Sequence, residues 1–167
     1  MGDPLGKLRS LKILTDACRE PLRIPRLISR NDAHAAILSD VVVFDGTCGF
    51  CTWSIAAFTM RIASGSRVVP SQWLSDVRLA EIGTTREQCA REVHYVDAGG
   101  QTYRGADAVN AVLARTPLIG GLTRFVARRP ALLAFERACY AWIAAHRVGI
   151  SRALGTQRCA LIPERAM

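Results

Sequence analysis

The sequence is poor in lysine, in aromatic residues and in long apolar runs. Lysine occurs only as Lys7 and Lys12, so the formal net charge of +8 comes almost entirely from arginines spread along the chain. The aromatic residues make up 7% of the chain and lie in apolar patterns rather than between arginines, so we expect no dedicated nucleic-acid site. No stretch of about 18 uncharged apolar residues occurs, so the sequence predicts no membrane-spanning helix.

The chain also lacks the features of a secreted protein. Its start, Met1-Gly2-Asp3-Pro4-Leu5-Gly6-Lys7, has no basic segment followed by an apolar stretch and a small-residue cleavage site. A close pair occurs only once among the six cysteines, which are Cys18, Cys48, Cys51, Cys89, Cys139 and Cys159. One working pair in a reducing compartment fits this spacing better than a disulfide framework does. The expected location is therefore the cytoplasm.

Residues 1–38 have the pattern of an N-terminal extension. Four leucines between Leu5 and Leu14 recur at helical spacing beside basic residues, and Pro21 and Pro25 break any longer helix. Such a basic amphipathic segment can contact a membrane surface peripherally. A helix that packs on its own domain, or a partly flexible segment, is the favoured interpretation.

Residues 39–167 alternate between short apolar runs and helical patterns, and we interpret them as one domain. Two strands joined by a helix are predicted to be parallel, and a hairpin with Gly99-Gly100 at its turn follows. The predicted strands are 41–45, 67–70, 92–97 and 101–104. Helices or helical turns are predicted at 49–63, 73–81, 85–90, 106–115, 118–128 and 131–146. The fold class is therefore α/β (α+β), a thioredoxin-like βαβ-ββα core with a mixed sheet and additional C-terminal helices.

Cys48-Gly49-Phe50-Cys51 lies in the turn between the first predicted strand and the first predicted helix. The first turn of a helix has unpaired N–H groups and the positive end of the helix dipole, which stabilise a thiolate. A spacing of three also places both sulfurs on one face of the turn. The sequence thus predicts a redox-active dithiol.

The motif Asp45-Gly46-Thr47-Cys48-Gly49-Phe50-Cys51 resembles the Asp-x-x-Cys-x-x-Cys signature of the DCC family of predicted thiol–disulfide oxidoreductases. Further segments resemble the family in the same order along residues 40–165. They are Pro70-Ser71-Gln72, Val93-His94-Tyr95-Val96-Asp97, Tyr103-Arg104-Gly105-Ala106-Asp107-Ala108, Tyr140-Ala141-Trp142-Ile143-Ala144-Ala145-His146-Arg147 and Cys159-Ala160-Leu161-Ile162-Pro163. The resemblance implies a thioredoxin-like fold and dithiol chemistry. We expect no bound cofactor, and an external thiol or reductase as electron donor.

We assign three catalytic residues from this pattern. Cys48 is nearer the turn and is the expected attacking thiolate, while Cys51 resolves the mixed disulfide. Asp45 either accepts a proton during resolution or caps the N–H groups of the turn, and its negative charge opposes the helix dipole by raising a nearby thiol pKa. Gly46 is expected to give the turn backbone freedom, and Thr47 to be the N-cap.

Four further residues are expected to line the site, namely Gly49, Phe50, Gln72 and Arg104. Arg104 could steer an anionic substrate. Cys159 is a candidate third redox cysteine if the C-terminal tail folds back over the sheet. His94, in the middle of a strand, is interpreted as structural, and Cys139 as a core residue. The segment before the hairpin, Cys89-Ala90-Arg91-Glu92, has no counterpart of the cis-proline with which thioredoxins hold substrate backbone.

The function predicted is thiol–disulfide exchange with a protein or small-molecule disulfide, of the protein-disulfide reductase type. The alternative is a thioredoxin-like binding module without redox turnover. Its two cysteines would be structural, or would form half of a zinc site with Cys89, His94 or Cys159. No second Cys-x-x-Cys and no His-x-x-x-His occurs, so no metal is expected. A third hypothesis is a membrane-surface or nucleic-acid adaptor that uses the basic extension.

Overall fold

A four-stranded mixed sheet forms the centre of the protein. The computed structural model describes residues 18, 24–34, 38–61, 65–117 and 119–162, with the backbone alone at 59–61. The strands are β1 (Val41–Phe44), β2 (Arg67–Pro70), β3 (His94–Val96) and β4 (Thr102–Arg104), in the order β2-β1-β3-β4. The pair β1/β2 is parallel, whereas β1/β3 and β3/β4 are antiparallel. The predicted mixed α/β class and the predicted hairpin are confirmed.

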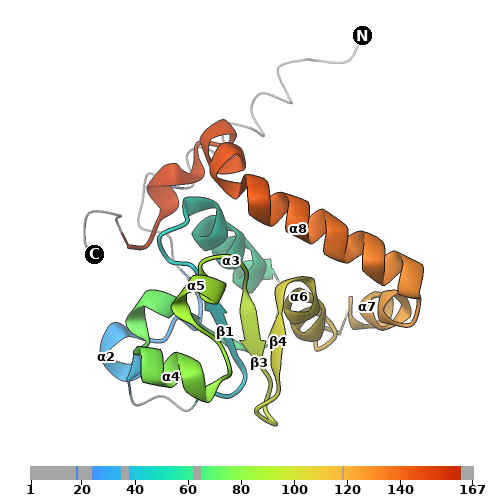
Figure 1. Ribbon diagram of the computed structural model, residues 1–167, viewed down its shortest axis with the longest axis horizontal. Helices are drawn as coiled ribbons and strands as arrows, with labels where there is room; N and C mark the ends of the chain where they lie inside the picture. The colour runs from blue at the N-terminus through green and yellow to red at the C-terminus, as the bar shows by residue number, and fades with distance from the viewer. Residues whose placement is uncertain (1–17, 19–23, 35–37, 62–64, 118, 163–167) are drawn as a thin grey trace.

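The helices cover both faces of this sheet and extend beyond it (Figure 1). The α-helices are α2 (Arg30–Ala33), α3 (Gly49–Arg61), α4 (Asp76–Glu81), α5 (Arg86–Cys89), α6 (Gly105–Leu113), α7 (Gly120–Ala127) and α8 (Pro130–Ala153). Two short 3-10 helices, η1 (Ser71–Trp73) and η2 (Thr156–Cys159), follow β2 and α8 respectively. Helix α3 is the crossover that makes β1 and β2 parallel, as the sequence predicts.

Successive side chains of β1 point to opposite faces of the sheet and belong to two separate hydrophobic clusters. Val41 and Val43 point to the face that α2, α4 and α5 cover, where they pack with Leu79. Val42 and Phe44 point to the opposite face and pack with residues of α3 and α6 such as Ala56. All four residues of β1 are buried, because both faces of this central strand are covered.

Part of the predicted N-terminal extension packs against the sheet. The N–H of Ile28 donates to the carbonyl of Val68 at 2.9 Å, and the N–H of Val68 donates to the carbonyl of Arg26 at 3.1 Å. Ile24 and Ile28 are buried. The segment before α2 therefore adds a short bridge along the outer edge of β2. The helix predicted around Leu5–Leu14 lies outside the described residues.

Helix α8 is longer than predicted, because it continues through Gly149 to Ala153. Its inner side faces α3 and α6, whereas Phe135 and Trp142 are 69% and 60% exposed on its outer side. Cys139 is exposed as well, so the prediction that it is a core residue is wrong. The helical spacing of Phe135, Cys139 and Trp142 identifies a stripe, but it does not say which side of the helix meets the sheet layer. Among the described residues, no helix meets the length and apolarity needed to cross a membrane.

His94 is completely buried in β3, between β1 and β4. Its Nε2 lies 2.9 Å from the hydroxyl of Thr84, which in turn lies 3.8 Å from the sulfur of Cys89. Burial, to which the positive charge of Arg104 adds in the same direction, lowers the pKa of His94 to about 4. His94 is therefore a neutral, hydrogen-bonded core residue at neutral pH.

This depressed pKa predicts that the fold loses stability in mild acid. Between pH 6.5 and pH 4, His94 is protonated in the unfolded chain but stays neutral in the folded chain. The free energy of unfolding therefore falls as the pH is lowered. The loss from this one group is at most about 3 kcal/mol. In His94→Gln the amide keeps a hydrogen bond to Thr84 but cannot titrate, so its stability should fall less over the same pH range. Urea denaturation across that range measures both slopes, and parallel slopes would exclude His94 as the cause.

Candidate functional site

The two cysteines of the Cys-x-x-Cys motif form a disulfide at the start of α3. Their Cα atoms are 5.2 Å apart. Because α3 begins at Gly49, Cys48 occupies the N-cap position, and the N–H of Cys51 donates to the Cys48 sulfur at 3.2 Å. The expectation that Thr47 is the N-cap is therefore wrong. A helix-start N–H directed at the Cys48 sulfur is the contact that stabilises a thiolate.

The Asp45 carboxylate organises the turn before the dithiol. Asp45 follows β1 directly and is only 7% exposed. Its Oδ1 accepts hydrogen bonds from the Thr47 N–H at 3.0 Å, the Thr47 hydroxyl at 2.6 Å and the Gln72 amide at 2.9 Å. Asp45 thus caps an N–H group of the turn, as expected from the sequence, and this N–H belongs to Thr47, two residues before α3 begins. A role as proton acceptor remains a prediction.

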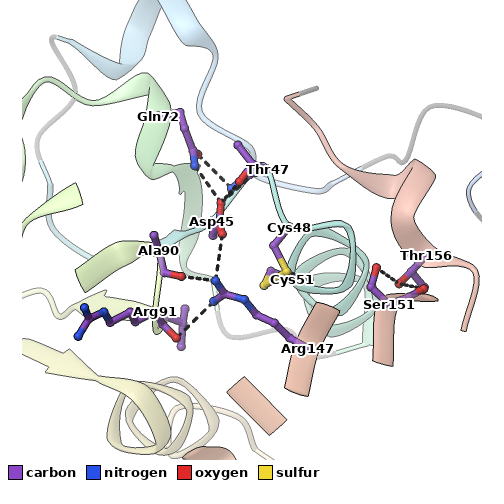
Figure 2. The surroundings of a disulfide bond; sticks show 12 residues. Asp45, Thr47, Cys48, Cys51, Gln72, Ala90, Arg91, Arg147, Ser151 and Thr156 are labelled. Carbon is purple, nitrogen blue, oxygen red and sulfur yellow. Dashed lines mark hydrogen bonds and ion pairs between the residues drawn. A yellow bond between two sulfur atoms is a disulfide. The ribbon is translucent and has the colours of Figure 1, made fainter. Parts of the chain in front are cut away.

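Gln72 fixes the same turn from the neighbouring strand. It lies in η1, just after β2, so the parallel pairing of β1 and β2 brings it beside the residues that follow β1. Its Nε2 donates to Asp45, while its Oε1 accepts the Gly46 N–H at 3.0 Å. One amide side chain therefore holds both the carboxylate and the backbone of the turn, as Figure 2 shows. The predicted position of Gln72 beside the motif agrees with this placement.

Arg147 reaches the site from the inner side of α8. Its guanidinium donates to the carbonyls of Ala90 and Arg91 and lies 3.7 Å from Oδ2 of Asp45. The Arg147 side chain is 21% exposed, so this ion pair is partly shielded from water. Figure 2 shows the two cysteine sulfurs on the side of α3 that faces Asp45 and Arg147. The guanidinium therefore offsets the carboxylate that would otherwise disfavour a thiolate there.

Sequence reasoning missed the role of Arg147, although the sequence contains a signal for it. Arg147 lies two helical turns after Tyr140, so both residues share one side of α8. The Tyr140 hydroxyl accepts the N–H of Val93 at 3.0 Å, which marks this side as the one that faces β3. An arginine on the inward side of a helix needs a buried acceptor, and Asp45 with the two carbonyls provides it.

Gly46 is required for close packing rather than for backbone freedom. Positive φ angles occur at Gly65, Gly83, Gly100, Gly105 and Gly155, and Gly46 is not among them. A Cβ at Gly46 would lie 2.8 Å from Cβ of Pro70. The C-terminal segment also meets this turn, since the N–H groups of Leu161 and Ile162 donate to the Gly46 carbonyl at 2.9 and 3.1 Å. The expectation that Gly46 provides backbone freedom is therefore wrong, and close packing is the reason for a glycine here.

Gly49 allows η2 to lie directly against the start of α3. A Cβ at Gly49 would be 2.1 Å from the carbonyl oxygen of Thr156. The same segment carries Cys159, which is 5% exposed and forms a disulfide with Cys18. The structure therefore brings the C-terminal tail to the site, the condition for a redox role of Cys159, but gives Cys159 a partner 141 residues away. A redox role for this second pair remains a prediction.

Of the remaining predicted site residues, Phe50 lies at the site and Arg104 lies away from it. Phe50 is half-buried in the first turn of α3 and its ring lies 6.2 Å from that of Trp53. Arg104 lies on β4, two strands away from β1, where it donates to the carbonyl of Gly83. Cys89, an alternative zinc ligand, is buried beside Thr84. Within the described ranges, no group of three or more His, Cys, Asp or Glu residues is arranged to hold a metal ion.

Comparison with known proteins identifies a family. A family model described as DCC1-like thiol-disulfide oxidoreductase matches residues 42–153, which span the sheet, the dithiol and α8. This match confirms the family resemblance inferred from the motif. Neither the curated proteins nor the solved structures that were compared include a match to the chain.

The close contact at Gly49 predicts that Gly49→Ala destabilises the fold. The methyl group must displace the backbone of η2, which costs roughly 1–3 kcal/mol of the free energy of unfolding. Gly149→Ala is the matched control, because a Cβ there meets nothing within 4 Å. The control should raise stability by about 0.5–1 kcal/mol through helix propensity. Urea denaturation compares both variants with the wild type, and an unchanged midpoint for Gly49→Ala would contradict the packing.

The ion pair with Asp45 predicts that Arg147→Met raises the pKa of the Cys48 thiol. Methionine keeps much of the side-chain volume but leaves the carboxylate without its positive neighbour, so the shift should be about one unit upwards. Arg137→Met is a matched control on the same helix, because Arg137 pairs with the distant Asp107. The pH dependence of iodoacetamide alkylation of Cys48 measures the pKa. Equal profiles for Arg147→Met and the wild type would contradict the electrostatic role.

Proposed function

The chain belongs to the DCC1-like thiol-disulfide oxidoreductase family, and from this membership we propose that Cys48 and Cys51 exchange a disulfide with a substrate, with Cys48 attacking and Cys51 resolving. The observation that supports this order is the hydrogen bond from the Cys51 N–H to the Cys48 sulfur. That donor favours the charged form of Cys48 in the reduced protein. Cys51 lies inside the first turn of α3 and cannot use the same contact.

The reaction proceeds through a mixed disulfide. The Cys48 thiolate attacks one sulfur of the substrate disulfide, and the other substrate sulfur leaves as a thiolate. Cys51 then loses its proton and attacks the Cys48 sulfur, which forms the Cys48–Cys51 disulfide and releases the second substrate sulfur. The substrate gains two electrons and the protein loses two. An external thiol or reductase returns the protein to its dithiol form.

Asp45 and Arg147 control the charge around this exchange. Oδ1 of Asp45 is occupied by three donors, whereas Oδ2 faces Arg147. We assign Oδ2 as the acceptor of the Cys51 proton during resolution. Arg147 keeps the carboxylate from suppressing the Cys48 thiolate before that step. Gln72 and Thr47 hold Asp45 in place and do not take part in the chemistry.

The proposal includes reduction as the direction, a disulfide of a protein or small molecule as the substrate, no bound cofactor and a cytoplasmic location. The direction depends on the electron donor that meets the protein. A cytoplasmic location requires that the Cys18–Cys159 pair is reduced in the cell, because disulfides persist in oxidising compartments and are usually reduced in the cytoplasm.

Trapping of the mixed disulfide tests the assigned roles. Cys51→Ser should accumulate a mixed disulfide between Cys48 and one mercaptoethanol half of hydroxyethyl disulfide, while the other half leaves as free mercaptoethanol, because no second thiol releases the adduct. Cys48→Ser should trap at least about tenfold less, since its remaining thiol lacks the helix-start donor. Both variants carry Cys139→Ser as well, because this exposed free thiol would otherwise form the same adduct, and Cys139→Ser alone is the control. Intact-mass spectrometry over time measures the adducts.

Two results would contradict the proposal. Equal, slow reaction of Cys48 and Cys51 would indicate structural cysteines. Stoichiometric zinc that protects both thiols from alkylation would indicate a metal-bound module instead. Either result would favour a thioredoxin-like binding module without redox turnover.

A further inference from the structure

An apolar cavity of about 230 Å³ adjoins the dithiol. It lies over the sheet face formed by β1 and β3 and is bounded by α3, α6 and α8. Its wall consists mainly of apolar and aromatic side chains, among them Phe44, Phe50, Phe58, Val112, Tyr95 and Ile143. Cys51 is part of the wall, so the cavity borders the redox pair. Helix α8 covers it with Tyr140, Ala144 and Arg147.

The positively charged groups in the wall are engaged or directed elsewhere. Asp45 and Arg147 face each other, and the guanidinium also donates to the carbonyls of Ala90 and Arg91. Figure 2 shows the side chain of Arg91 pointing away from the sulfurs. The Glu92 carboxylate lies beside Gly105 at the start of α6. An anionic ligand would therefore lose hydration without gaining a free positive partner, and it would meet the Glu92 carboxylate. Together with the apolar wall, this favours an uncharged ligand.

The Tyr140 hydroxyl supplies one polar contact within this apolar wall. It accepts the Val93 N–H, so its own proton is available to an acceptor in the cavity. Burial raises the pKa of Tyr140, so the hydroxyl remains a neutral donor. A ligand with one carbonyl or amide oxygen and an alkyl body matches this combination.

Resting on the proposed function, we propose that the cavity binds a small, uncharged disulfide with an alkyl chain, with its sulfurs at the Cys48–Cys51 end and its chain along the apolar wall. A 150 Å³ apolar cavity accommodates benzene, so about 230 Å³ suits roughly ten non-hydrogen atoms. An extended peptide fits less well, because Arg147 already occupies the Ala90 and Arg91 carbonyls on the loop that precedes β3.

The exchange with such a ligand balances without a further component. The reduced pair gives two electrons and two protons to the ligand, whose S–S bond breaks to give two thiols. The protein is left with the Cys48–Cys51 disulfide, and an external thiol restores the dithiol.

Two alanines of α8 provide matched variants. Ala144 is part of the cavity wall, whereas its neighbour Ala145 is exposed on the outer side of the helix. Ala144→Phe should fill the cavity, and Ala145→Phe should add the same ring outside it. Val109→Phe fills the cavity from α6 and replaces Ala144→Phe if that variant does not fold.

The experiment measures how fast the reduced full-length protein is oxidised by lipoamide, an uncharged cyclic disulfide on an alkyl chain, and by hydroxyethyl disulfide, which is small and polar. The ratio of the two rates in each variant, divided by the ratio for the free dithiol dithiothreitol, cancels the intrinsic reactivity of the disulfides. The wild type should favour lipoamide at least about tenfold by this measure, which corresponds to about two buried methylene groups. Ala144→Phe should lose this preference and keep its rate with hydroxyethyl disulfide, while Ala145→Phe should keep both. Octanamide, which has the chain without the sulfurs, should inhibit only the lipoamide reaction.

Several outcomes would overturn the assignment. If the wild type shows no normalised preference for lipoamide, or if Ala144→Phe retains that preference, the cavity is not the substrate site. Oxidation by both disulfides would still support the proposed function. A peptide disulfide with apolar flanks that outcompetes lipoamide and is blocked by Ala144→Phe would make a peptide side chain the occupant. If neither disulfide oxidises the pair, the proposed function fails. Calorimetry with octanamide then shows separately whether the cavity binds an alkyl chain.

Discussion

The site depends on the hydrogen bonds and the ion pair of the Asp45 carboxylate. It is almost fully buried, and a buried carboxylate is costly unless donors surround it. Here the donors come from the turn itself, from Gln72 after β2 and from Arg147 on α8. The need to satisfy one charge therefore ties together three segments that are far apart in the sequence. The dithiol sits where these segments meet (Figure 2).

The same turn is also the place where the C-terminal part of the chain returns to the domain. The carbonyl of Gly46 accepts two N–H groups of the tail, and η2 packs against Gly49 at the start of α3. Both glycines lack a side chain at points of close backbone approach. Together with α8, the tail packs against α3, at whose start the two partly exposed cysteines lie. The surroundings of the redox pair thus include segments from the C-terminal part of the chain, which the minimal βαβ-ββα core does not contain.

Local patterns were sufficient to predict the elements that carry the chemistry. The apolar run of β1, the Cys-x-x-Cys turn and the hairpin around Gly100 each lie within a few residues, so spacing alone identifies them. Other features depend on contacts between distant segments. The partner of Arg147, the packing at Gly46 and the Cys18–Cys159 pair follow from how α8 and the tail return to the turn. The exposure of one side of α8 could not be predicted for the same reason. Apolar residues such as Phe135 and Trp142 at helical spacing do not show which other element, if any, packs against them.

The central claim is that Cys48 and Cys51 form one reversible redox couple. A titration of the full-length protein in glutathione buffers, with alkylation and mass spectrometry to count reduced thiols at each cysteine, tests it most directly. The account predicts that Cys48 and Cys51 change state together, in one transition with the slope of a two-electron couple and a disulfide between them. Independent glutathionylation of the two cysteines, or no disulfide between them at any buffer ratio, would contradict it.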